Sequence, residues 1–190
     1  SKTKSFYRAI ANLKERTREY PRNPILWMDL AYFYSAIGQT HAAENAVVVA
    51  LSLNSDNRYL LRSGARFFMH IGAPETALNF LKRSSLAKSD PWILAAEIAI
   101  CDTLESPIRS VKRARSLLES ESIPKFHLSE LASALGTIEL KNGARKKGRQ
   151  LFKLALEEPT ENALAQATFM NNMLGETIQP VNSERLSQAF

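Results

Sequence analysis

The sequence of 190 residues predicts an all-α protein, built as a stack of antiparallel helix hairpins. Apolar residues recur at the spacing of one helix face: within 24–37 the stripe consists of Trp27, Leu30, Ala31 and Tyr34. The same order of small and large residues returns after 34 positions. The aligned pairs are Leu30 and Gly64, Ala31 and Ala65, Tyr34 and Phe68, and Gly38 and Gly72. One hairpin cannot bury its apolar faces alone, so neighbouring hairpins must stack on it.

The first segments of the chain predict a truncated hairpin followed by a complete one. Residues 5–21 fit the second helix of a hairpin that lacks its first, and the chain begins within this repeat without a methionine. We therefore expect it to be a fragment of a longer protein. Residues 24–57 form the complete hairpin. Asn23 caps its first helix, Pro24 suits the first turn, and Gly38 ends the helix before a second helix at about 40–53.

The later segments follow the same pattern with one interruption. Residues 58–91 match well, but 92–125 are degenerate because Asp102 and Arg115 fall on apolar positions. In that segment the step of 34 places Ile98, Ala99, Ser106, Val111 and Leu118 on the pattern. After a three-residue insertion the pattern returns in 129–162, and 163–190 read as a terminal helix and a tail. The matching positions in 129–162 are Leu135, Gly136, Gly143, Gly148, Phe152 and Ala155.

The small residues of the pattern predict where the helices of each hairpin approach most closely, because facing positions must be small when two helices pack tightly. On the first helices these positions are Ala31, Ala65, Ala99 and Gly136. On the second helices they are Ala43, Ala77 and Gly148.

These positions resemble the signature of the tetratricopeptide repeat (TPR) family. In 24–57 the matching residues are Trp27, Leu30, Ala31, Tyr34, Gly38, Ala43, Val47 and Ala50. The resemblance covers about residues 5–175. It implies a right-handed superhelical stack of hairpins, a TPR-like solenoid, whose concave groove binds peptides or proteins and which carries no catalysis. We therefore expect residues 1–190 to form a single array.

Catalytic and membrane functions find little support in the sequence. It contains no glycine-rich phosphate loop, HExxH or CxxC motif, and its three histidines lie far apart. We therefore predict no enzyme activity, no cofactor and no metal site. The longest apolar run, Ala46–Leu51, is too short to span a bilayer. The single cysteine, Cys101, reads as a buried thiol in a reduced, cytoplasmic protein.

Basic residues cluster on the second helices of the third and fourth hairpins, and the formal net charge is +6 with a pI near 9.5. By the repeat register Arg109 would stack on Lys146 and Lys112 on Arg149, facing outward on the convex side. Such a ridge either keeps the helices soluble or binds phosphates or an acidic partner. No aromatic residue interleaves with it. The ridge residues are Arg109, Lys112, Arg113, Lys146, Arg149 and Lys153.

The resemblance places the concave surface on the first helix of each hairpin. The candidate partner-binding residues are Met28, Tyr32, Tyr59, Arg62, Arg66, Met69, Ile93 and Ile100. Tyrosine and arginine are common interface anchors, and Arg62 with Arg66 could grip an acidic side chain or could instead pair with carboxylates such as Asp29. The expected function is a protein–protein interaction scaffold that binds a segment with acidic and apolar residues. The alternatives are RNA or acidic-partner binding by the ridge, and self-association.

Overall fold

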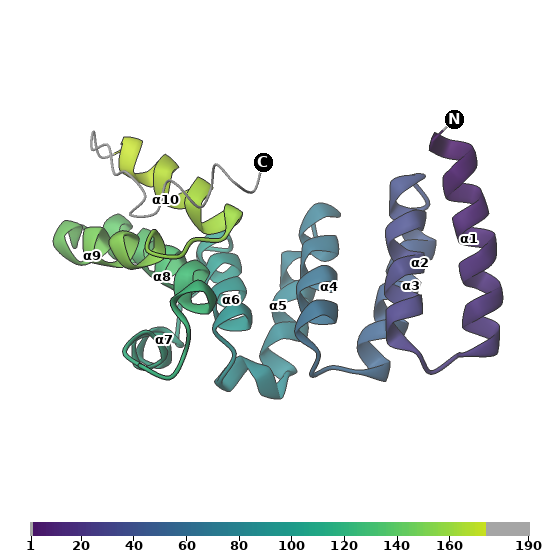
Figure 1. Cartoon of the computed structure of the whole chain (residues 1–190), viewed down its shortest axis with the longest axis horizontal. Helices are drawn as coiled ribbons and strands as arrows, with labels where there is room; N and C mark the ends of the chain where they lie inside the picture. Colours follow the sequence, from purple (N-terminus) through teal and green to yellow (C-terminus); the bar gives the residue numbers. More distant parts are fainter. Residues whose placement is uncertain (1, 174–190) are drawn as a thin grey trace. The chain divides into compact units, whose positions relative to one another are not determined.

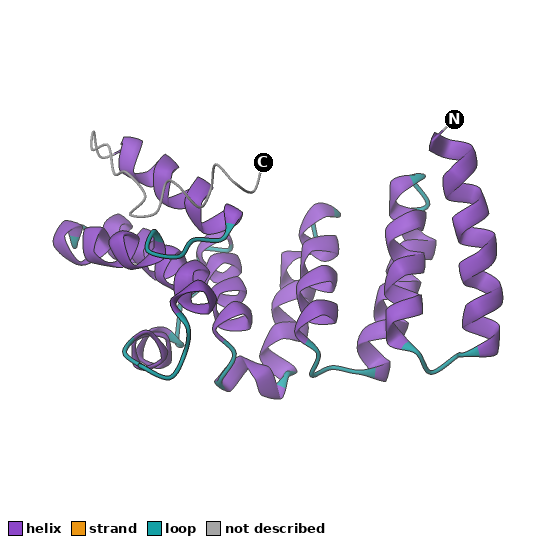
Figure 2. Ribbon diagram, viewed as in Figure 1, coloured by secondary structure: helices purple, strands orange, loops and turns teal. Residues whose placement is uncertain are grey.

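A computed structural model of the chain describes residues 2–173, which fold into helices joined by short turns, with no strand among them (Figure 2). The predicted tail within 163–190 therefore lies largely outside the described residues. The chain divides into two compact units, Ser1–Ala87 and Lys88–Phe190. We call them unit 1 and unit 2 and describe each by itself.

Unit 1 contains a single helix and two antiparallel hairpins (Figure 1). The hairpins pair α2 with α3 and α4 with α5, and α1 packs against α2. The helices that the sequence predicts at 24–37 and 40–53 are present. The bounds are α1 (Lys2–Glu19), α2 (Pro24–Ala36), α3 (Thr40–Leu53), α4 (Arg58–His70) and α5 (Pro74–Arg83), followed by a 3₁₀ turn at Ser85–Lys88.

Unit 2 contains the remaining helices. Its first hairpin, which is the third hairpin of the chain, departs from the regular form. The second helix of that hairpin, α7, has only eight residues, of which Ala114 alone is buried. The first helix, α6, packs more extensively against α8 than against α7. The bounds are α6 (Pro91–Thr103), α7 (Val111–Leu118), α8 (Lys125–Lys141), α9 (Arg145–Ala155) and α10 (Glu161–Met173).

Side-chain caps start the first helices of successive hairpins. The Oδ1 atom of Asn23 accepts a hydrogen bond from the Ile25 amide at 3.0 Å, and that of Asn57 accepts from the Leu60 amide at 3.0 Å. In unit 2 the Asp90 carboxylate accepts from the Trp92 amide at 2.9 Å. Each cap satisfies an amide that the first helical turn leaves without a backbone partner. Asn57 follows Asn23 by 34 positions, but Asp90 follows Asn57 by only 33.

The turns that end these helices show the same one-residue difference. Gly38 and Gly72 have φ angles of 78° and 76°, in the left-handed region that favours glycine. The next such turn holds Glu105 at a φ of 52°, and the Ser106 amide donates to the Cys101 carbonyl at 2.9 Å, closing the turn. The predicted placement of Ser106 at the glycine position is therefore wrong by one residue.

The step of 33 residues, in place of 34, changes which residue of α6 is expected to be buried. The sequence pattern places Ala99 at the closest contact of the third hairpin, but Ala99 is exposed. Ile98, one residue earlier, is fully buried in the core of unit 2. The prediction for Ala99 is wrong because the step into this hairpin is 33 and not 34.

In the fourth hairpin the predicted close approach of α8 and α9 is present. A Cβ atom added at Gly148 would lie 3.2 Å from the Gly136 carbonyl oxygen, and one added at Gly136 would lie 3.1 Å from the Phe152 ring. Both glycines thus allow the backbones to approach more closely than side chains would permit. The residues of unit 1 that correspond to Gly148 are Ala43 and Ala77, and both are fully buried.

Candidate functional site

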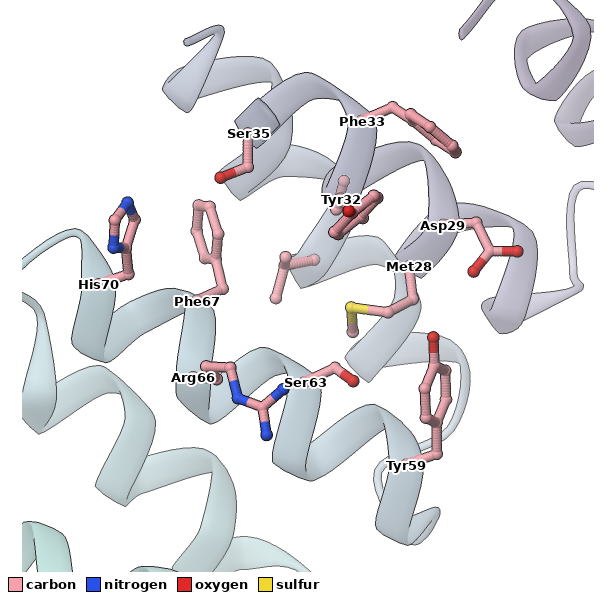
Figure 3. A pocket seen from close by; sticks show the side chains of 12 residues that line it. Met28, Asp29, Tyr32, Phe33, Ser35, Tyr59, Ser63, Arg66, Phe67 and His70 are labelled. Atoms are coloured by element: carbon pink, nitrogen blue, oxygen red, sulfur yellow. The ribbon is translucent and has the colours of Figure 1, made fainter. Parts of the chain in front are cut away.

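Unit 1 has a hollow of about 660 Å³ between the first helices of its two hairpins, α2 and α4 (Figure 3). Most of its lining comes from these two helices, and Val47 of α3 forms part of its floor. The lining residues are Met28, Asp29, Ala31, Tyr32, Phe33, Ser35, Val47, Tyr59, Ser63, Arg66, Phe67 and His70.

Helix geometry explains why these side chains converge. On α4, Tyr59, Ser63, Arg66 and His70 follow one another at intervals of three or four, so they share one face of the helix. That face turns toward α2, where Met28 and Tyr32 are also four positions apart. The hollow therefore has one wall from each helix.

Four of the predicted concave residues of unit 1 line this hollow: Met28, Tyr32, Tyr59 and Arg66. Tyr32 is 65% exposed and Tyr59 52% exposed, whereas Met28 is only 4% exposed. The tyrosine rings are therefore accessible at the rim, and the methionine forms the floor. Arg62 and Met69, also on α4, are half-buried and are not among the lining residues.

The hollow has a carboxylate at one end. Burial raises the pKa of Asp29 above its usual value, although the positive charge of Arg16 on α1 and a hydrogen bond with the Tyr59 side chain act in the opposite direction. In Figure 3 the Tyr59 hydroxyl and the Asp29 carboxylate lie on the same side of the hollow. From the sequence, Asp29 was predicted only as a possible ion-pair partner of Arg62 and Arg66.

Basic and hydroxyl side chains lie toward the other end. Figure 3 shows His70 beside Ser35 and Phe67, with Arg66 next along α4. Arg66 and His70 are both exposed. Neither Ser63 nor His70 was predicted from the sequence as a site residue. Their spacings of three and four from Arg66 place both on the same face of α4 as Arg66.

Two predicted partner-binding residues of unit 2 are not available on the surface. Ile93 is fully buried and Ile100 is 5% exposed. Both lie on α6, most of whose residues are buried. As apolar side chains on such a helix they join the interior, so the prediction that they present a concave surface is corrected.

The predicted ridge residues lie on or near α7 and α9 of unit 2, and all are exposed except Arg149, which is half-buried. The corrected register aligns Arg109 with Lys147 and Lys112 with Gln150, in place of the predicted pairs with Lys146 and Arg149. On α7, Arg115 forms an ion pair with Glu139 of α8. Neither α7 nor α9 contains an acidic residue. However, α9 has four exposed basic residues, Arg145, Lys146, Lys147 and Lys153, and within residues 2–173 none of these has an ion pair with another helix like that of Arg115. The exposed basic character is therefore strongest on α9.

In unit 2 the contact between the first helices α8 and α10 is filled with hydrogen bonds. Ser133 Oγ donates to Gln166 Oε1 at 3.0 Å, and Gln166 Nε2 donates to Thr137 Oγ1 at 3.2 Å. Nearby, the Thr160 hydroxyl donates to Glu130 Oε1 at 3.0 Å. Ser133, Thr137 and Glu130 of α8 therefore bind α10 and the residue before it in the same chain.

Comparison with known proteins identifies a fold but no family. No family model matches the chain, and no curated protein matches it. Among solved structures it is similar to the crystal structure of MamA, a TPR-like protein, with a TM-score of 0.59 and 18% sequence identity over 85% of this chain and 91% of that chain. The fold is TPR-like.

The described residues contain neither a metal-binding cluster nor a membrane-spanning helix. Within residues 2–173 no group of three or more histidine, cysteine, aspartate or glutamate side chains is arranged to hold a metal ion. In the same part of the chain, no helix has both the length and the apolar character needed to cross a bilayer. The thiol of Cys101 is buried.

Proposed function

We propose that the protein is a protein–protein interaction module and that the hollow between α2 and α4 is its recognition surface. The module holds a segment of a partner protein, with an apolar side chain over Met28 and the segment running between the exposed rings of Tyr32 and Tyr59. The array predicted for residues 1–190 is part of this proposal, as is the absence of enzyme activity.

The observation that carries the proposal is the combination of exposure and depth in one hollow. Two tyrosines that are more than half exposed stand at the rim of a hollow whose floor includes Met28, Ala31 and Val47, all nearly inaccessible to solvent. Exposed large aromatic side chains beside an apolar depression are typical of interface anchors and their pockets. The TPR-like fold supports the same class of function.

The test is a selection of random linear peptides on the whole chain. Peptides enriched on the wild type should bind Ser63→Trp at least about tenfold more weakly, because the indole fills the hollow. Asn79→Trp, which makes the same substitution at an exposed site on α5, is the matched control and should bind normally. Circular dichroism should be unchanged in both variants. Equal binding of the peptides by the two variants would place recognition elsewhere on the protein. If the protein instead sediments as a dimer in analytical ultracentrifugation, self-association is favoured.

The exposed basic face of α9 supports a second candidate function, the binding of RNA through its phosphates. Arg145, Lys146, Lys147 and Lys153 are exposed on a helix without acidic residues. Phosphate binding by such a face releases counterions, so affinity should fall steeply as salt rises.

A fluorescent single-stranded oligonucleotide provides the test. Replacing Arg145, Lys146 and Lys147 by glutamine should weaken binding and reduce the salt dependence. The matched control replaces Lys82, Arg83 and Lys88, which are also exposed, and should change little. If the oligonucleotide does not bind even at low salt, this candidate function is excluded.

A further inference from the structure

We propose that the hollow between α2 and α4 recognises a partner segment carrying two opposite charges on either side of an apolar residue. The cationic side chain lies at the Asp29 end and the anionic side chain at the Arg66 end. This inference rests on the proposed function and adds to it the chemistry of the partner: the hollow selects a pair of opposite charges at a fixed separation.

The Asp29 end has the composition of a cation site. Asp29 is half-buried, and burial is the main cause of its raised pKa, which means that its charged form lacks full solvation. Arg16 and the Tyr59 side chain compensate in part. A ligand cation would complete this compensation, and the exposed ring of Tyr59 beside it offers an aromatic face to a lysine or arginine side chain.

The Arg66 end has the opposite character. The guanidinium of Arg66 is a cation that can bind a carboxylate with two parallel hydrogen bonds. His70 lies one turn further along α4, and the hydroxyls of Ser35 and Ser63 also line the hollow. No acidic residue lines this end of the hollow. The structure therefore offers an anionic ligand group a cation and several hydrogen-bond donors.

The middle of the hollow is apolar. Met28 is 4% exposed and lies between Asp29 and Arg66 in Figure 3, and the lining residues Ala31 and Val47 are 2% and 0% exposed. An apolar side chain placed here would leave water, at a gain of about 25 cal/mol for each Å² that becomes buried. The central residue of the segment thus supplies affinity, and the flanking charges supply selectivity.

Helix geometry sets the separation of the two charges. Tyr59, whose side chain forms a hydrogen bond with Asp29, lies seven residues from Arg66 on α4, a rise of about 10 Å at 1.5 Å per residue. An extended peptide advances about 3.3 Å per residue, so this rise corresponds to about three positions. His70 would extend the range to about five positions.

Segments with other charge patterns fit less well. A purely acidic segment would bring a like charge to Asp29, and a purely apolar one would remove the remaining water from Asp29 without replacing it. A purely basic segment would bring a like charge to Arg66. Only opposite charges at both ends leave no charge of the hollow uncompensated.

The experiment uses the same peptide selection and reads the charge pattern of the enriched sequences. On the wild type, enriched peptides should share a basic and an acidic residue about three to five positions apart with an apolar residue between them. On Asp29→Asn only the preference for the basic residue should disappear, and on Arg66→Gln only the preference for the acidic one. Replacing the matched charge in an enriched peptide should weaken binding about tenfold to the wild type.

The same replacement should have almost no effect on the variant that lacks the corresponding charge. The charge pattern is refuted if peptides that depend on the hollow, as judged by Ser63→Trp, show one charge sign only or no charge preference. In that case the proposed function would stand without this inference. If no enriched peptide depends on the hollow, both fail together.

Discussion

The pairs of first helices in the two units, α2 with α4 and α8 with α10, have equivalent positions but different contents. Counting back from Gly38 and Gly143, Met28 corresponds to Ser133 and Tyr32 to Thr137. Counting forward from the caps Asn57 and Thr160, which bind the amides of Leu60 and Ala163, Ser63 corresponds to Gln166. The long amide of Gln166 bonds both α8 hydroxyls, whereas the short Ser63 leaves space between α4 and α2.

This difference shows that the hollow depends on side-chain size more than on the fold. The α8–α10 contact closes because one side chain reaches across it and satisfies the buried Ser133 and Thr137. The α2–α4 contact stays open because its residue at the corresponding position ends at a hydroxyl. Recognition is therefore expected where the chain leaves its own helix contact unfilled.

The largest expected effect tests the helix register on which the comparison rests. Ala65→Leu places a large side chain at a buried contact of α4, where Ala65 is 6% exposed, and should lower the free energy of unfolding of unit 1 by about 1–3 kcal/mol. Urea unfolding followed by Trp27 fluorescence in a Trp92→Phe background measures it. Lys147→Ala, at an exposed site of unit 2, should change stability by less than about 0.5 kcal/mol when unfolding is followed by Trp92 fluorescence in a Trp27→Phe background. Similar values for both variants would contradict the register.

Removing the amide that fills the α8–α10 contact should have the next largest effect. Gln166→Ala leaves the fully buried Ser133 hydroxyl without its acceptor and should cost about 1–2 kcal/mol. Trp92 fluorescence during urea unfolding, in a Trp27→Phe background, reports on unit 2. The matched change Ser63→Ala should cost less than about 0.5 kcal/mol. If Ser63→Ala lowers the free energy of unfolding as much as Gln166→Ala does, the two residues contribute equally to their helix contacts and the comparison fails.

Giving unit 1 the residue of unit 2 should convert the open contact into a filled one. Ser63→Gln should weaken peptides selected on the wild type about tenfold, because the longer side chain occupies the hollow. Thermal melting should change little, since the new amide enters existing space. Isothermal titration measures the affinity, and unaltered binding would indicate that the hollow is not the recognition surface.

The smallest effect concerns how the loop before α4 is held. In unit 2 the corresponding loop binds α8 through Thr160 and Glu130, whereas in unit 1 Asp56 accepts hydrogen bonds from the Ser85 amide at 2.8 Å and the Ser84 hydroxyl at 2.9 Å. These bonds lower the pKa of Asp56 below 3.8. Its charged form therefore stabilises unit 1 at pH values above 3.8, and this contribution is lost as the pH falls through the lowered pKa.

Comparison of the wild type with Asp56→Asn by urea unfolding at several pH values measures this contribution. The wild type should be the more stable protein at neutral pH, and the difference should shrink at pH values below 3.8, as Asp56 becomes protonated. A difference that stays constant down to about pH 2 would show that the charge of Asp56 contributes nothing.

Most of the fold could be predicted from the sequence because its local signals agree. Asn23, Pro24 and Gly38 define the start and end of α2 without reference to any other part of the chain. The register of the third hairpin was predicted wrongly because its turn lacks the glycine that marks the other turns. Glu105 occupies the glycine position there. One clue was available: Pro107 follows Glu105 at the same distance as Pro74 follows Gly72.

The candidate site was less predictable because exposure depends on neighbouring helices. Tyr32, Tyr59 and Arg66 were chosen from repeat positions and do line the hollow. Ile93 and Ile100 were chosen in the same way and are buried. Nothing local distinguishes an apolar side chain that faces a groove from one that joins the core. The role of Ser63 depends on the width of the gap that it leaves, which only the packed helices define.

The turn at Glu105 also has a consequence for the dynamics of unit 2. A non-glycine residue in the left-handed region costs about 1 kcal/mol or more. Here it precedes the shortest α-helix of residues 2–173, which has no side-chain cap and one buried residue. The amide hydrogens of α7 should therefore exchange with solvent through local opening, well before those of α8 and α9. Proteases should also cleave first in this segment, since local opening exposes the backbone there.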